Sequence, residues 1–218
     1  MIRQDYLIRM IAQFGQLWTS LIASLRARAF PSARRTLDQA YEQVLGINAE
    51  VANRLTGHEL LARMQFGVGA EAGRERSLML SALLQAEAEL ASDADLGAQF
   101  YQKSLDLLLA TSLQQPEQAL PDYAPTVAQL TGALADYQVP PHTGQLLVRY
   151  YEQAGAFAQA EDQLYELRAL SPDSPAVRQL GEAFYLRMRA LGDAELQAGN
   201  FSRAEADAGL AHWRGQAP

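Results

Sequence analysis

The sequence predicts an all-α protein made of stacked antiparallel helix pairs, and three features of its pattern support that fold class. Apolar residues recur at spacings of three and four over most of the chain, as they do on one face of a helix. No segment alternates with a period of two for long enough to be a strand. Prolines, glycines and capping residues divide the chain into segments of helix length. The apolar share of 49% is enough for a continuous core.

The first predicted helix carries the clearest periodic signal. Such a signal is typical of a helix packed on a core, and also of a helix lying on a membrane surface. The face opposite the apolar stripe has too few Lys and Arg residues to attract anionic lipid. We therefore expect a core helix, with peripheral membrane binding through this helix as an alternative. The stripe consists of Leu7, Met10, Ile11, Phe14, Leu17, Trp18, Leu21, Ile22 and Leu25.

Three further helices complete an N-terminal helical region, residues 1–66. The first spans Pro31–Gly46, with proline in its first turn and glycine as its C-terminal cap. The second spans Asn48–Leu55, and its asparagine is a preferred N-cap. The third spans Thr56–Phe66 and opens with a capping box between its threonine and Glu59.

The middle region, residues 67–115, is predicted to be a loop followed by a helix pair. The loop is Gly67–Gly73. Because no strand precedes it and no Gly-Lys-Ser/Thr follows it, its glycines predict a connection and not a phosphate-binding loop. The helices span about Arg74–Ala91 and Ala94–Leu113, with Asp93 as the cap between them.

The C-terminal region, residues 116–218, begins with a proline-rich hinge. Its prolines at 116, 121 and 125 cannot all lie inside one helix. A serine N-cap and a first-turn proline open the fourth helix that follows. We expect the three regions to form one continuous domain. The expected helices of the last region are Pro125–Tyr137, His142–Ala154, Phe157–Ser171, Ser174–Ala198 and Phe201–Arg214.

A repeated pattern of large and small residues marks this last region. Glycine permits a tight turn between two helices, a small alanine permits close helix approach, and proline ends the second helix. The residues that follow this order are Leu147, Tyr151, Gly155, Ala160, Leu164 and Pro172. Leu191-Gly192 and Gly199 to Ala204 repeat its core, and Arg28 to Ala33 parallels Gly155 to Ala160. The small residues at 33, 97, 160 and 204 are unevenly spaced, so the repeats are irregular.

This pattern resembles the tetratricopeptide repeat. The segments Met1–Ile11, Asp136–Pro141 and Tyr150–Leu164 resemble an uncharacterised family of small bacterial tetratricopeptide-like helical proteins. The resemblance implies an α-α superhelix and a bacterial origin, and it implies no activity. It also implies a partner-binding groove on the first helix of each pair. The groove positions are Gln145, Arg149, Glu152, Gln153, Arg189 and Asp193.

Composition narrows the possible functions. There is no cysteine, and three histidines lie far apart, so we expect neither a metal nor a cofactor. No catalytic motif is present, which argues against an enzyme. Residues up to Leu80 contain ten Arg and seven Asp/Glu, and the remainder contains eight Lys/Arg and eighteen Asp/Glu. The acidic remainder is a poor surface for nucleic acid, and segments of opposite charge can attract each other within one chain or between two.

No uncharged apolar run approaches the ~20 residues that span a bilayer, and charges at Arg3, Asp5 and Arg9 interrupt any signal-peptide pattern. We expect a cytoplasmic protein that binds no membrane. The leading hypothesis is a protein–protein interaction scaffold. It would bind either a protein partner or a second copy of itself, as a homodimer. The alternative is a small-molecule or peptide-binding sensor, or an enzyme, with its site between helix pairs.

Overall fold

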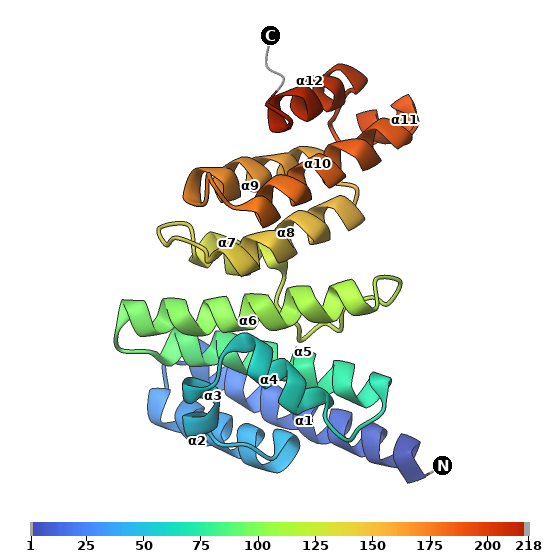
Figure 1. Cartoon of the computed structure of the whole chain (residues 1–218). Coiled ribbons are helices and arrows are strands. Elements are labelled where there is room, and N and C mark those ends of the chain that lie inside the picture. The colour runs from blue at the N-terminus through green and yellow to red at the C-terminus, as the bar shows by residue number, and fades with distance from the viewer. Residues whose placement is uncertain (1, 216–218) are drawn as a thin grey trace. The chain divides into compact units, whose positions relative to one another are not determined.

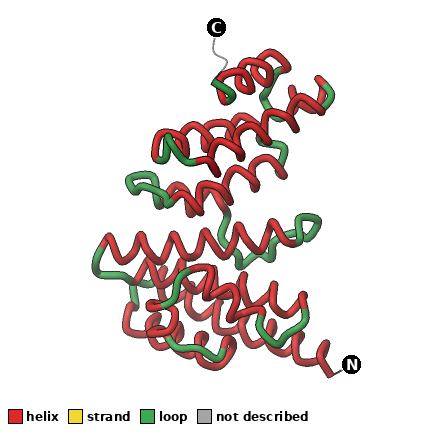
Figure 2. The backbone as a smooth tube through the Cα atoms, in the orientation of Figure 1, coloured by secondary structure: helices red, strands yellow, loops and turns green. Residues whose placement is uncertain are grey.

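The structure is a computed structural model that describes residues 2–215, with side chains from residue 5 onward. Every regular element among these residues is helical, which confirms the all-α prediction (Figure 1, Figure 2). The chain divides into two compact units, Met1–Gln138 and Val139–Pro218. The division falls inside the Asp136–Pro141 joint, and each unit is described by itself.

Unit 1 contains seven α-helices and one π-helical turn among its described residues. The helix pair α5 (Ala70–Leu90) and α6 (Ala94–Gln114) forms its centre, and α4 (Gly57–Gln65) packs against both. The remaining elements are α1 (Ile2–Arg26), α2 (Phe30–Ala40), η1 (Tyr41–Leu45), α3 (Ala49–Arg54) and α7 (Val127–Ala133).

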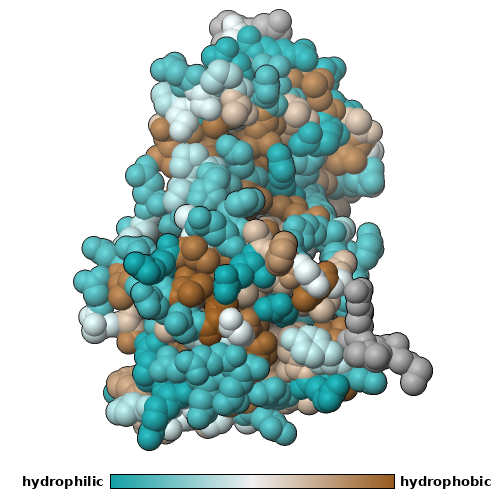
Figure 3. Space-filling view, turned by 60° about the horizontal axis from the view of Figure 1, so that its bottom comes forward, coloured by the Kyte–Doolittle hydropathy of each residue, from teal (hydrophilic) through white to brown (hydrophobic). Residues whose placement is uncertain are grey.

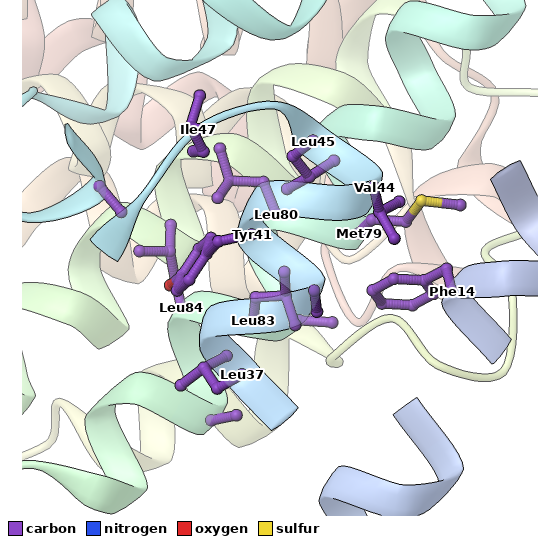
Figure 4. Packing of buried hydrophobic residues seen from close by; sticks show 14 of the residues in the cluster. Phe14, Leu37, Tyr41, Val44, Leu45, Ile47, Met79, Leu80, Leu83 and Leu84 are labelled. Atoms are coloured by element: carbon purple, nitrogen blue, oxygen red, sulfur yellow. The ribbon is translucent and has the colours of Figure 1, made fainter. Parts of the chain in front are cut away.

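Most of the apolar stripe of α1 faces the core of unit 1, as expected, whereas Ile11 is 39% exposed. Phe14 and Leu21 are fully buried. Phe14 packs beside residues of η1 and α5, including Val44 and Met79 (Figure 4). The inner face of α1 is therefore occupied by protein, and a membrane contact through α1 would need its outer face, where Ile8 is 61% exposed.

The predicted helix starts of unit 1 are largely confirmed, because capping side chains are local signals. Asn48, Thr56 and Asp93 each accept a hydrogen bond from the backbone N–H three residues on, at 2.8–3.3 Å. Two predicted boundaries are wrong. Helix α5 begins at Ala70, so Gly73 lies inside a helix, where an added Cβ would lie 3.2 Å from Gln65 Cγ of α4. Helix α7 covers Val127–Ala133 in place of Pro125–Tyr137, because Thr126 is its cap.

Unit 2 contains five helices among its described residues. The pair α8 (Pro141–Gln153) and α9 (Phe157–Leu170) turns at Gly155, whose φ of +72° suits glycine. The other helices are α10 (Pro175–Ala190), α11 (Asp193–Ala198) and α12 (Arg203–Trp213). Ala160 and Leu164 are fully buried, as the repeat pattern predicts.

The prediction of one helix over Ser174–Ala198 is wrong. The chain breaks at Leu191–Gly192, and α11 starts there because the Gly192 N–H donates to the Glu195 carboxylate at 2.9 Å. Helix α10 therefore pairs directly with α12. The contact is tight: a Cβ added at Gly181 would lie 2.2 Å from Trp213, and one added at Gly209 would lie 2.1 Å from Tyr185.

The expected repeat positions around α12 are also wrong by one or two residues. The left-handed turn residue is Asn200, with φ of +54°, and not Gly199. Ala204 is exposed, and Ala206 is the small residue buried against the core. The reason is the cap: the Ser202 hydroxyl accepts from the Glu205 N–H, so α12 begins at Arg203.

No helix among residues 2–215 is long and apolar enough to cross a membrane.

Candidate functional site

The outward face of α8 carries four of the six expected groove residues. Helix α8 begins with Pro141 in its first turn and buries Gly144, Leu147 and Val148 on its inner side. Residues three and four apart share a helix face, so Gln145, Arg149 and Glu152 form one row beside the buried stripe, with Gln153 at its edge. Gln145 and Glu152 are half-buried, and Arg149 and Gln153 are exposed.

An ion pair fixes this face of α8 to α10. The guanidinium of Arg187 donates from Nη2 to Glu152 Oε2 at 2.8 Å, and Arg187 Nε donates to Glu152 Oε1. This is a two-point arginine–carboxylate contact, which holds both side chains in one geometry. The Glu152 side chain is only 16% exposed. The hydrogen bonds to the Glu152 carboxylate raise the pKa of Arg187 above its ordinary value.

The last two expected groove residues lie at a different place, the corner of α10, α11 and α12. Arg189 pairs with Asp207 of α12 at 2.7 Å, and Asp193 pairs with Arg203 at 2.8 Å. Residues two apart on a helix point roughly 200° apart, so Arg187 and Arg189 face opposite sides of α10. The six residues therefore form two groups: the α8 row, and the corner.

Arg203 holds the corner together. Its guanidinium donates to the carbonyl oxygens of Arg189 and Leu191, at 2.5 and 2.6 Å, and to Asp193 Oδ1. A cation that bonds carbonyls at the end of a helix also complements the helix dipole. Arg189 and Asp193 thus take part in ion pairs of unit 2 while their side chains remain 49% and 73% exposed, and the α8 row exposes Arg149 and Gln153.

Sequence reasoning missed the partners Arg187, Arg203 and Asp207. Arg187 and Glu152 are 35 residues apart, and no local pattern links them. A local signal exists for Arg203, because this arginine directly follows the serine cap Ser202 and lies one turn after Gly199.

The α8 row contains a single carboxylate, Glu152, which is paired with Arg187. No group of three or more His, Asp or Glu side chains within the described part of the chain could hold a metal ion. The row offers amides, a guanidinium and a paired carboxylate on a rigid helix. Such groups bind by hydrogen bonds and charge, which is what a macromolecular contact uses.

Comparison with known proteins identifies the family. A model of a family of unknown function, DUF6483, matches residues 1–217. The chain belongs to this family. Membership agrees with the expectation of an uncharacterised family. No curated protein and no solved structure matches the chain.

Proposed function

We propose that this DUF6483 chain is a protein–protein interaction scaffold, with the α8–α10 face as its partner-binding surface. One observation carries the proposal: Arg149 and Gln153 are exposed on a helix that the Glu152–Arg187 pair locks to its neighbour. A helix that is already held in place has little backbone freedom left to lose on binding, so only its exposed side chains need to be ordered. The turn at Gly155 and the buried Ala160 support a tetratricopeptide-like arrangement, in which first helices bind partners.

Charge supports a protein partner over nucleic acid. Residues 1–138 contain eleven Lys/Arg and fifteen Asp/Glu, and residues 139–218 contain seven and ten, so both units are net negative. Phosphate contacts dominate nucleic-acid affinity, and a net negative unit repels phosphate.

The expected attraction between the basic first 80 residues and the acidic remainder acts at least partly within unit 1. Arg34 of α2 donates to Glu87 of α5 at 2.7 Å, with the Glu87 side chain 9% exposed. Because Arg34 and Glu87 already pair within the chain, this pair contributes no attraction between two copies. We therefore propose a different protein as the partner, and self-association is an outcome of the test.

The experiment compares two variants of the full chain in affinity purification from the native host. Arg149→Glu reverses a charge on the proposed face. Arg178→Glu reverses an exposed charge in the first turns of α10 and is the matched control. We expect the wild type and Arg178→Glu to recover the same protein, and Arg149→Glu to lose it. Loss in both variants or in neither would contradict the proposed face. Recovery of nothing, with a monomer in sedimentation, would contradict the scaffold itself.

A further inference from the structure

A surface pocket in unit 1 has the chemistry of a ligand site and lies outside the face proposed above. It has a volume of about 500 Å³, within the range of roughly 300–1,000 Å³ that small-molecule sites occupy. It is lined by Leu45, Gly46, Ala62, Arg63, Phe66 and Arg76.

Three helix segments form the pocket, and two of them end there. The π-helical turn η1 ends at Gly46, which has φ of +65°. Helix α4 ends at Gln65 with Phe66 as its C-cap, and the chain continues through Gly67, with φ of +71°. Arg76 of α5 borders both ends. The π turn η1 directly follows α2 and places Leu45 and Gly46 at the pocket.

The pocket is electropositive. Arg63 and Arg76 line it, and no carboxylate does. Arg76 Nη2 donates to the Leu45 carbonyl oxygen at 2.8 Å, which fixes the guanidinium beside η1, and Arg76 Nε has no hydrogen-bond partner. Neither arginine forms an ion pair with any residue that the structure describes. Two guanidinium groups without counter-charge favour an anion.

The pocket is also apolar on one side. Phe66 is 85% exposed, the most exposed large hydrophobic side chain of the described chain, and Leu45 and Ala62 line the pocket beside it. Elsewhere in unit 1, apolar groups also reach an otherwise hydrophilic surface (Figure 3). Covering a water-exposed aromatic ring with an apolar ligand lowers the free energy of the complex.

We propose that this pocket binds an organic carboxylate whose anionic end meets Arg63 and Arg76 and whose apolar body covers Phe66. Neither half of the ligand is sufficient alone. An exposed ion pair is weak in water, so a bare anion has little affinity. A neutral apolar molecule leaves the two guanidinium groups without counter-charge. The carboxylate can belong to a free acid or to the C-terminus of a peptide, and we commit to the free acid.

The experiment titrates the isotope-labelled full chain with four probes and follows backbone NMR shifts. The probes are phenylacetate, the neutral isostere phenylacetamide, inorganic phosphate, and a short peptide ending in phenylalanine. We expect phenylacetate at millimolar concentration to shift signals of residues 45–46, 62–66 and 76. The amide and phosphate should bind at least about tenfold more weakly. The peptide should bind no more tightly than phenylacetate, and tighter binding would assign the site to a peptide terminus.

Variants make the test specific. Arg63→Gln and Phe66→Ser change side chains that are exposed in the structure, so their folding should be unaffected. Each should weaken phenylacetate binding about tenfold. Arg54→Gln is the control, because Arg54 is exposed, pairs with Glu50 and does not line the pocket. Equal binding of acid and amide, or unchanged binding in Arg63→Gln and Phe66→Ser, would overturn the proposal. The result is independent of the α8–α10 face, whose residues lie in unit 2.

Discussion

Replacing Gly181 by alanine tests the packing that joins α10 to α12. A Cβ at this position would lie 2.2 Å from Trp213 Cε3, 2.4 Å from Cδ2 and 2.5 Å from Cζ3. Carbon atoms in van der Waals contact are roughly 3.5–4.0 Å apart, so the indole must move by more than about 1 Å. The indole is held from other sides, by the guanidinium of Arg168 at 5.0 Å and by Tyr185.

Two effects of Gly181→Ala oppose each other. Alanine is a better helix former than glycine by about 0.5–1 kcal/mol. Overpacking a buried site costs about 1–3 kcal/mol. Since Trp213 is 4% exposed and all three clashing atoms belong to its ring, we expect the clash to win. The net loss should be about 1–2 kcal/mol, or about 4–16 °C in the midpoint of unit 2.

Hydrogen exchange is the suitable assay, because a chain with two compact units can unfold in more than one step. Amides of α10 and α12 should lose protection by the same free energy in Gly181→Ala. The control is Gly15→Ala in α1, where an added Cβ meets no atom within 4 Å. That change should stabilise unit 1 by about 0.5–1 kcal/mol.

A double-mutant cycle with Trp213→Leu isolates the clash. The smaller side chain removes the ring that the new Cβ meets. The indole N–H has no hydrogen-bond partner in the structure, so its removal breaks no hydrogen bond. In the Trp213→Leu background, Gly181→Ala should therefore cost little or become stabilising. Additive effects of the two changes would refute the reasoning.

Three further predictions concern single side chains. Arg28 has φ of +54° at the turn before α2, so Arg28→Gly should stabilise unit 1 by about 0.5–1 kcal/mol. Gly155 has φ of +72°, so Gly155→Ala should destabilise unit 2 by about 1 kcal/mol. Urea unfolding measures both changes. Burial raises the pKa of the Glu87 carboxyl despite its bond to Arg34, so the folded protein holds this proton more tightly than the unfolded chain does. The free energy of unfolding should then fall as pH rises from the ordinary pKa of glutamate through the raised pKa of Glu87. Urea unfolding of Glu87→Gln between about pH 4 and 7 should lack this decrease. Arg203→Met should lower the hydrogen-exchange protection of α11 by about 1–2 kcal/mol, because three helix-end contacts are lost.

The parts of the fold that could be predicted from the sequence are those set by contacts within one turn. Asn48, Thr56 and Asp93 cap helices where expected, because each side chain bonds a backbone N–H only three residues away. Gly155 takes the left-handed turn for the same local reason. Such signals lie side by side in the sequence.

The parts that could not be predicted depend on residues far apart in the chain. The apolar period continues through Leu191, so nothing in the α10 pattern alone shows that Arg203 will bond the carbonyl oxygens at its end. The groove positions follow from the resemblance to a repeat, and that resemblance does not show that Arg189 turns toward Asp207 while Arg187 turns toward α8. The unit 1 pocket was missed because its walls come from three separate segments.

The recurring element in this chain is a short turn followed by a buried alanine, and not a repeat of fixed length. The residues before the turns into α2 and α9 are both left-handed, with φ of +54° at Arg28 and +72° at Gly155. Five residues later, Ala33 and Ala160 are each fully buried. The turn and the alanine need each other, because the turn sets the crossing of two helices and the alanine permits their close approach. Neither constrains the length of chain before the next turn, which accounts for anchors at irregular spacing.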